Sequence, residues 1–268
     1  MNQDFIVTKE HRRFTEFANA VRKEKTIGIC HGDAGVGKTN SAHRYANGEA
    51  LEPYLTAWRP RGDHDAKHYA LANRSRTVFY TPEVLCRPKT LMDEADHWQA
   101  RVGICADEHL RTLDPVPLRP GRAAHLVELL IIDEAERLTP TALELLRDRH
   151  DRTHLAMILI GMPGIDQRFR HYPQLYSRLG FSHHYRALGC DELLFVLDRH
   201  WKRLGRTLDP GDFTDAQAIA AIERITRGNF RLLERLFPQI ARVLKINQLE
   251  TFTDDVIEAA ASILVIGN

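Results

Sequence analysis

The chain has 268 residues, of which 43% are apolar, and its formal net charge is +1. This composition is globular and excludes disordered and fibrous classes, while the near-neutral charge excludes a generic polycation. Any nucleic-acid contact must therefore come from a local basic patch. The length allows one large domain, or a main domain with a smaller one.

The N-terminus carries charges where a signal peptide would need an apolar core, and no run of about 18 apolar residues is present. None of the four cysteines has C-x-x-C spacing, which supports neither a zinc ribbon nor a disulfide framework. We therefore expect free thiols, a cytoplasmic location and no membrane partner.

Helical and strand patterns alternate from the start of the chain. Apolar residues at helical spacing predict a helix over 8–24, and a short strand is predicted over 26–30. A glycine-rich loop follows, and then a helix from Lys38 to about Asn47. The segment 48–76 is polar and longer than a usual connection, so we expect an irregular insertion there.

The alternation continues after this segment. β-forming residues predict a strand over 77–81, a helix follows Pro88, and the prolines of 114–122 predict a loop. Continuous apolar runs predict buried strands within 126–133 and 154–161. Between these strands, Thr139 and Pro140 are placed to begin a helix. The pattern predicts a doubly wound parallel sheet.

The pattern becomes helical throughout after about residue 190. Four amphipathic segments predict four helices, and Thr214 with Gln217 has the spacing of a capping box, with Gly228 as the expected stop. We therefore predict an α/β nucleotide-binding domain over 1–190 and an all-helical domain over 191–268.

The glycine-rich loop has the spacing Gly32-x-x-x-x-Gly37-Lys38-Thr39 of a Walker A motif, between a strand and a helix. Glycines let main-chain N–H groups turn toward phosphates, and the helix N-terminus adds a favourable dipole. Lys38 would reach the β- and γ-phosphates, and Thr39 would hold Mg²⁺. We predict that ATP contacts a run of consecutive residues: Gly32, Asp33, Ala34, Gly35, Val36, Gly37, Lys38, Thr39 and Asn40.

A second pair of chemically active residues follows the buried strand "LLII". Asp133, at the end of this strand, would face the metal ion and form part of the ATP-binding site. Glu134 is placed to polarise an attacking water as a general base. Two carboxylates here favour hydrolysis of ATP over transfer of its phosphate to another substrate.

With "GDAGVGKT" and "LLIIDEAERL", the later stretches "YSRLGF" and "GNFRLL" resemble AAA+ ATPases, most closely the transposition regulators of the TnsC, TniB and MuB kind. The resemblance covers nearly the whole chain. It implies a P-loop AAA+ domain followed by a small helical lid. It also implies a bacterial ATPase that is found on the nucleoid when it binds DNA.

The resemblance implies roles for two arginines. Arg178 corresponds to the arginine finger, which acts on a neighbouring subunit's nucleotide, and Arg231 to the sensor-2 arginine of the lid. Fixed guanidinium charges stabilise spread phosphoryl charge. AAA+ proteins commonly place a polar residue after the strand "MILIG", where this chain has Met162. Methionine cannot donate a hydrogen bond, so slow hydrolysis is expected.

The resemblance further implies partners. The protein would oligomerise with ATP on double-stranded DNA, as a hexamer or heptamer ring or a helical filament, and would engage a transposase and a target-selection protein. Lys89 matches the family's backbone-contacting lysine, and Arg87 and Arg101 are nearby candidates. Phosphate contacts of this kind predict salt-sensitive binding with little sequence preference.

Two alternatives remain open at this point. One is an AAA+ ATPase adaptor of a secretion or envelope system, which would have the same ATPase core but act on a different partner. The other is a nucleotide-gated assembly scaffold with negligible hydrolysis, which Met162 suggests.

Overall fold

A computed structural model describes residues 5–59, 62–113, 123–249 and 251–265. The chain divides into two compact units. The sheet unit comprises Arg13–Gly32 and Lys38–His184, and the helical unit comprises Met1–Arg12, Asp33–Gly37 and Tyr185–Asn268. The middle of the glycine-rich loop therefore groups with the helical unit, although both of its flanks group with the sheet unit.

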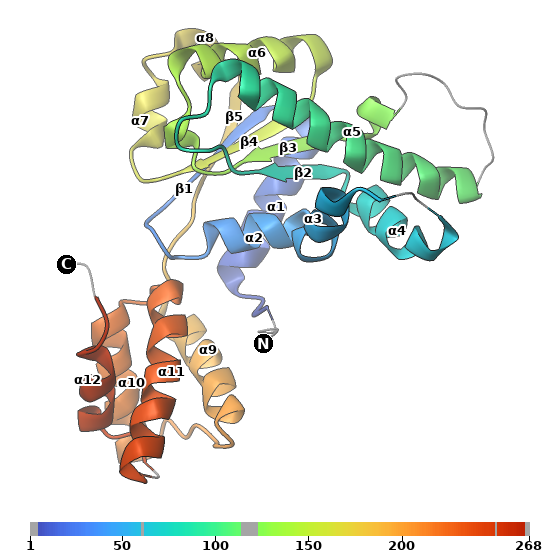
Figure 1. The fold of residues 1–268 in the computed structure, drawn as a ribbon. Coiled ribbons are helices and arrows are strands. Elements are labelled where there is room, and N and C mark those ends of the chain that lie inside the picture. The colour runs from blue at the N-terminus through green and yellow to red at the C-terminus, as the bar shows by residue number, and fades with distance from the viewer. Residues whose placement is uncertain (1–4, 60–61, 114–122, 250, 266–268) are drawn as a thin grey trace. The chain divides into compact units, whose positions relative to one another are not determined.

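The sheet unit contains five parallel strands in the order β2-β3-β4-β1-β5, which confirms the expected doubly wound parallel sheet (Figure 1). Their bounds are β1 Ile27–His31, β2 Thr77–Tyr80, β3 Leu129–Ile132, β4 Ala156–Gly161 and β5 Leu179–His184. The sequence patterns did not predict β5. It lies at an edge with alternate residues partly exposed, so it lacks the apolar run that marks the buried strands β3 and β4.

Helices lie on both sides of this sheet (Figure 1). The α-helices are α1 Lys9–Glu24, which begins in the range of the helical unit, α2 Lys38–Tyr45, α3 Gly48–Ala57, α4 Ala66–Ser75, α5 Pro88–Leu113, α6 Pro140–Thr153, α7 Ile165–Phe169 and α8 Pro173–Tyr176. Short 3-10 turns are η1 Asp63–Asp65, η2 Ala123–Leu126 and η3 Ala135–Arg137. The predicted cap of α6 is confirmed, since the Thr139 hydroxyl accepts a hydrogen bond from the Ala142 amide at 3.2 Å. The proline-rich loop 114–122 lies outside the described residues.

The prediction of an irregular insertion over 48–76 is wrong. Helices α3 and α4 occupy most of the described part of this segment, and Leu51, Leu55, Tyr69 and Ala72 join the core of the sheet unit. Leu51, Tyr54, Leu55 and Trp58 do follow the i, i+3, i+4, i+7 spacing of an amphipathic helix, but the polar composition of the segment as a whole masked this signal. Packing of a narrow apolar face supplies the stability that local propensity does not.

The helical unit packs α9 Cys190–Arg203, α10 Phe213–Thr226, α11 Phe230–Asn247 and α12 Asp254–Ala261 around a second core that contains the buried Trp201. The predicted capping box of Thr214 and Gln217 is wrong. Asp212 caps α10, because its carboxylate accepts hydrogen bonds from the amides of Thr214 and Asp215. Across the described parts of both units, no helix combines the length and the apolar character that a membrane crossing requires.

Candidate nucleotide site

The glycine-rich loop connects β1 to α2. Gly35 and Gly37 have φ values of +82° and +113°, a region that favours glycine because other residues would meet their own backbone. The side chain of Lys38 is buried, and its Nζ donates a hydrogen bond to the Gly32 carbonyl at 2.6 Å. The ammonium is thus held against the start of the loop within the sheet unit.

The two predicted metal ligands are in direct contact. Thr39 Oγ1 donates a hydrogen bond to Asp133 Oδ2 at 2.7 Å, and the Glu134 amide donates to Asp133 Oδ1 at 2.9 Å. Burial raises the pKa of Asp133 despite these two hydrogen bonds. A hydroxyl and a carboxylate are the oxygen donors that Mg²⁺ prefers, and a bound cation would keep Asp133 ionised. The pair therefore fits a magnesium ion.

Glu134 follows β3 in a left-handed conformation with φ of +51°. A residue other than glycine in this region is held there by its surroundings, and such positions concentrate at functional sites. Its carboxylate lies 3.9 Å from the Arg137 guanidinium, which in turn donates a hydrogen bond to the Pro82 carbonyl at 2.7 Å. The turn therefore holds Glu134 close to the end of β3.

Glu136 is a further carboxylate of this region that sequence reasoning missed. Its Oε2 atom is buried without a hydrogen-bond partner among the described residues, and it lies close to Gly161 at the end of β4. Burial raises the pKa of Glu136, and Glu134 and Asp133 raise it further. The third acid of "DEAE" was the available signal. Met162, which follows Gly161, is 41% exposed.

Within the helical unit, the start of α11 contacts the loop residues Asp33–Gly37. Asn229 Nδ2 donates a hydrogen bond to the Ala34 carbonyl at 2.7 Å, and the Arg231 amide donates to the Gly35 carbonyl at 2.9 Å. Asn229 also caps α11 by accepting from the Leu232 amide. The main chain of Arg231 is thus placed beside the loop. Asn229 was missed, although its position before a helix marks it as a cap.

Arg178 lies immediately before β5, far in sequence from the acids that end β3. Its Nε and Nη2 each lie 3.1 Å from an oxygen of Asp151, and Arg147 pairs with the same carboxylate at 2.9 Å. These two arginines lower the pKa of Asp151. Arg178 is thus held by α6 of the same chain.

The structure separates the three predicted DNA-binding residues into two environments. Arg87 and Lys89 are exposed at the start of α5. Arg101 lies twelve residues further along the helix, a rise of about 18 Å. Its guanidinium is 5.0 Å from the centre of the Trp58 ring and donates to the Leu55 carbonyl. Arg101 thus makes contacts inside the sheet unit that Lys89 does not make.

The comparisons with known proteins agree with this geometry. A family model described as an AAA domain matches residues 21–169, more than half of the chain. The chain belongs to the AAA domain family. A "Potential ATP-binding protein" of Staphylococcus aureus is 39% identical over 274 residues, covering 99% of this chain and 98% of that protein.

Solved AAA structures share the fold at low identity. The Thermotoga maritima RuvB Holliday junction branch migration motor aligns with a TM-score of 0.60 and 17% identity, over 98% of this chain and 71% of that one. The Aeropyrum pernix ORC2 protein in its ADP form aligns with a TM-score of 0.54 and 13% identity, over 97% and 70%. At such identities the likeness shows the P-loop AAA-type fold alone.

Proposed function

We propose that this AAA protein is an ATP-dependent, DNA-binding regulator of transposition, similar to the TnsC, TniB and MuB proteins. It assembles on duplex DNA with ATP, marks the target, recruits or activates a transposase, and disassembles after hydrolysis. In this proposal an α/β domain over 1–190 is followed by a lid over 191–268. The observation that carries the nucleotide chemistry is the 2.7 Å hydrogen bond between Thr39 and Asp133.

The proposed reaction is attack of water on the terminal phosphate of ATP. Lys38 neutralises phosphate charge, and the loop amides and the α2 N-terminus bind the phosphate oxygens. Thr39 and Asp133 hold Mg²⁺, which when bound neutralises charge on the phosphates. Glu134 accepts a proton from the attacking water. The held conformation of Glu134 supports this role.

Two arginines would couple hydrolysis to assembly. In this proposal Arg178 acts on the nucleotide of an adjacent subunit, so an isolated subunit hydrolyses slowly. Arg231 reports on the γ-phosphate from the lid, and the contacts of Asn229 and Arg231 with the loop support a link between the helical unit and bound nucleotide.

DNA contact is assigned to the loop before α5 and to its first turn. Arg87 and Lys89 are exposed there, next to Val84 and Leu85, which are 72% and 91% exposed. Cations beside exposed apolar side chains suit a surface that binds a charged polymer. The similarity in fold to a Holliday junction branch migration motor supports DNA as the bound polymer.

A scaffold with negligible hydrolysis is the second candidate. The observation that favours it is Met162, which lies after β4 and offers no donor to orient water. The lifetimes of assemblies formed by wild type and by Glu134→Gln separate the two. Equal lifetimes would favour the scaffold, and a longer lifetime for the variant would favour hydrolysis as the trigger for disassembly.

Electron microscopy of the purified protein with duplex DNA tests the main proposal. Samples with an ATP analogue, with ADP and without nucleotide are compared at low salt. Rings or filaments on DNA that require the ATP analogue are expected. Absence of DNA-dependent assembly under all three conditions would refute DNA-bound assembly as the function.

A further inference from the structure

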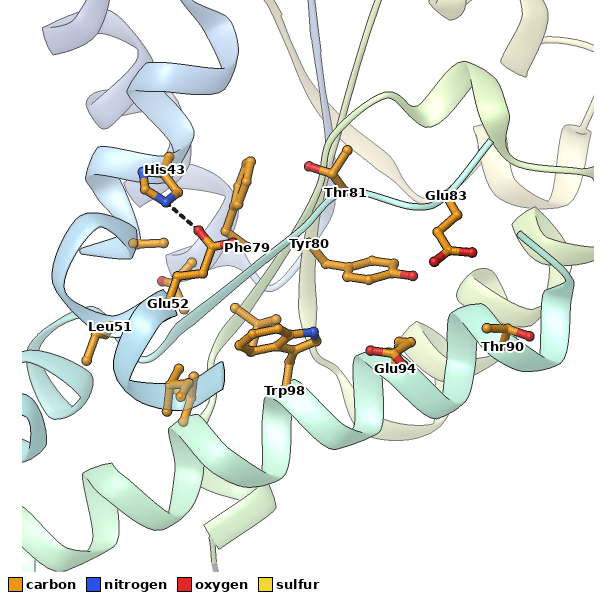
Figure 2. Close-up of a pocket in the computed structure, with 16 residues that line it drawn as sticks. His43, Leu51, Glu52, Phe79, Tyr80, Thr81, Glu83, Thr90, Glu94 and Trp98 are labelled. Atoms are coloured by element: carbon orange, nitrogen blue, oxygen red, sulfur yellow. Dashed lines mark hydrogen bonds and ion pairs between the residues drawn. The ribbon is translucent and has the colours of Figure 1, made fainter. Parts of the chain in front are cut away.

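A cavity of about 330 Å³ lies beside β2 in the sheet unit, in the size range of ligand pockets (Figure 2). Residues of α2 and α3 line one side of it and residues of α5 line the other. Its apolar surface comes from aromatic and aliphatic side chains, among them Leu51, Leu55, Phe79, Tyr80 and Trp98. None of its described lining residues belongs to the phosphate loop or to Asp133–Glu134. Neither Arg87 nor Lys89 lines it, although Glu83 and Thr90 come from the same loop and first turn of α5.

The cavity lies along the end strand of the sheet, where Thr77 and Val78 are buried and Phe79 and Tyr80 are half-buried. β2 is the end strand and pairs with β3, where the Arg76 and Tyr80 carbonyls accept hydrogen bonds from the amides of Glu128 and Asp133. In a parallel strand, the N–H and C=O of one residue point to the same side, and those of the next residue point to the opposite side. The main-chain groups of Thr77, Phe79 and Thr81 therefore point away from β3.

The lining of the cavity agrees with this orientation. All five consecutive residues 77–81 line it. Successive side chains of a strand point to opposite faces of the sheet, so a cavity on one face would meet only alternate residues. Contact with every residue places the cavity at the strand's edge. The N–H and C=O of Phe79 lie at the centre of that edge and match the main chain of an added strand.

The rim of the cavity is acidic. Glu52, Glu83 and Glu94 line it, and none of its described lining residues is lysine or arginine. His43 is the basic group present, and its Nε2 hydrogen-bonds to Glu52 at 2.8 Å. Figure 2 shows Glu94 and Trp98 extending from α5 toward β2, with Glu52 on the α3 side.

The negative potential also acts on a neighbouring side chain. Burial raises the pKa of the Tyr80 phenol, and the nearby Cys86, Glu94 and Glu83 raise it further. The same potential would attract a cation, while the Trp98 ring offers a face for its aliphatic stem or its charge. The edge of β2 can pair with the main chain of a peptide, and the acidic rim can bind a positive charge. A peptide that carries a basic residue meets both conditions.

We propose that this cavity binds an extended segment of a partner protein that carries a lysine or arginine. The segment adds to β2 through the main-chain groups of Phe79, and its basic side chain lies between Glu83 and Glu94 or beside Glu52. Apolar residues next to the basic one pack on Trp98 and Leu51. This site is independent of the nucleotide chemistry proposed above and would persist if that proposal failed.

Fluorescence anisotropy with labelled, blocked pentapeptides tests the site on the full chain. The probe is acetyl-Thr-Val-X-Val-Thr-amide, with lysine, arginine, serine or glutamate at X. We expect the lysine or arginine peptide to bind at least about tenfold more tightly than the glutamate peptide, because like charges repel at the rim. A lysine peptide with alternate amides N-methylated should lose binding, since it cannot complete the strand edge.

Matched variants locate the binding. The double change Glu83→Gln and Glu94→Gln should weaken the lysine peptide about tenfold. Glu16→Gln, an exposed acid on α1, should have no effect. Unchanged ATP binding by each variant reports that it is folded. Three results would each overturn the proposal. They are no binding by any of the peptides, equal binding of the glutamate or N-methylated peptide, and full binding of the lysine peptide by the double variant. Equal binding of the N-methylated lysine peptide would indicate recognition of a cation alone, and a dimer blocked by the peptide would indicate a second copy of this chain as the occupant.

Discussion

Arg178 and Asp151 form a two-point ion pair, in which Nε and Nη2 each lie 3.1 Å from one carboxylate oxygen. The pair connects the residue before β5 to the last turn of α6 and leaves the Arg178 side chain about one-third exposed. If Arg178 acts on a neighbouring subunit, the ion pair with Asp151 orients its guanidinium group before that contact forms. Arg147 shares the same carboxylate and provides a matched comparison.

Arg178→Ala should lower ATP turnover of the assembled protein by about 10³-fold or more and leave ATP affinity unchanged. Arg147→Ala, which removes the other partner of Asp151, should retain most turnover. A mixture of Arg178→Ala and Glu134→Gln subunits should regain activity, because one supplies the finger and the other the intact site. Steady-state phosphate release measures both, and a mixture without recovery would contradict action between subunits.

Glu134→Gln should reduce turnover by about 10²- to 10⁴-fold, because the amide cannot accept the proton of the attacking water. ATP binding should persist, since Lys38, Thr39 and Asp133 are unchanged. Glu49→Gln, an exposed acid on α3, is the control and should hydrolyse at the wild-type rate. Single-turnover measurement separates chemistry from binding, and wild-type turnover by Glu134→Gln would remove it from the mechanism.

Gly35→Ala should weaken ATP binding at least about tenfold, because the loop must shift to fit the new methyl group. A Cβ at this position would lie 2.6 Å from Asn229 Oδ1 and 2.8 Å from the Arg231 Cβ. Gly164→Ala is the matched control: its φ of +90° is similar, but no atom lies within 4 Å. Both changes should cost about 1 kcal/mol in backbone strain by urea unfolding. Equal ATP affinity of the two variants would contradict the prediction.

The free energy of unfolding should fall as the pH drops below about 6.5, in part through His31. Burial lowers the pKa of His31, and His184 and Lys38 lower it further, while Asp166 acts in the opposite direction. The unfolded chain therefore binds a proton at higher pH than the folded chain, so acidification favours unfolding in this window.

His31→Asn should flatten this pH dependence, whereas His154→Asn, at an exposed position after α6, should not. Urea unfolding at intervals from pH 5 to pH 8 measures the slope. A His31→Asn slope equal to that of wild type would assign the dependence to other groups.

Lys89→Ala should lower the slope of log affinity for duplex DNA against log salt by about one, the value for one lost phosphate contact. Arg101→Ala should leave the slope unchanged, because Arg101 is engaged by Trp58 and Leu55. Titrations at several salt concentrations with two unrelated DNA sequences measure both. An altered slope for Arg101→Ala alone would assign the phosphate contact to Arg101 instead of Lys89.

Local signals predicted much of the sheet unit. The apolar runs of β3 and β4, the cap at Thr139 and the glycine spacing each depend on residues adjacent in sequence. Prediction failed in α3 and α4, where a mostly polar segment masked the helical spacing of its apolar residues, and in β5, an edge strand without an apolar run. Asp212 rather than Thr214 caps α10. Both residue types are common at N-caps, so the local sequence did not distinguish between them.

The sequence by itself determined the phosphate loop, the acids that end β3 and the α/β alternation, because strand–turn–helix preferences act over a few residues. The tertiary structure alone decided that Asn229 meets Ala34, 195 residues away, and that Asp151 holds Arg178. It also decided that β2 is an edge strand with an acidic cavity beside it. Strand order and long-range contacts depend on how the whole chain buries its apolar faces, and spacing along the sequence does not encode that choice residue by residue.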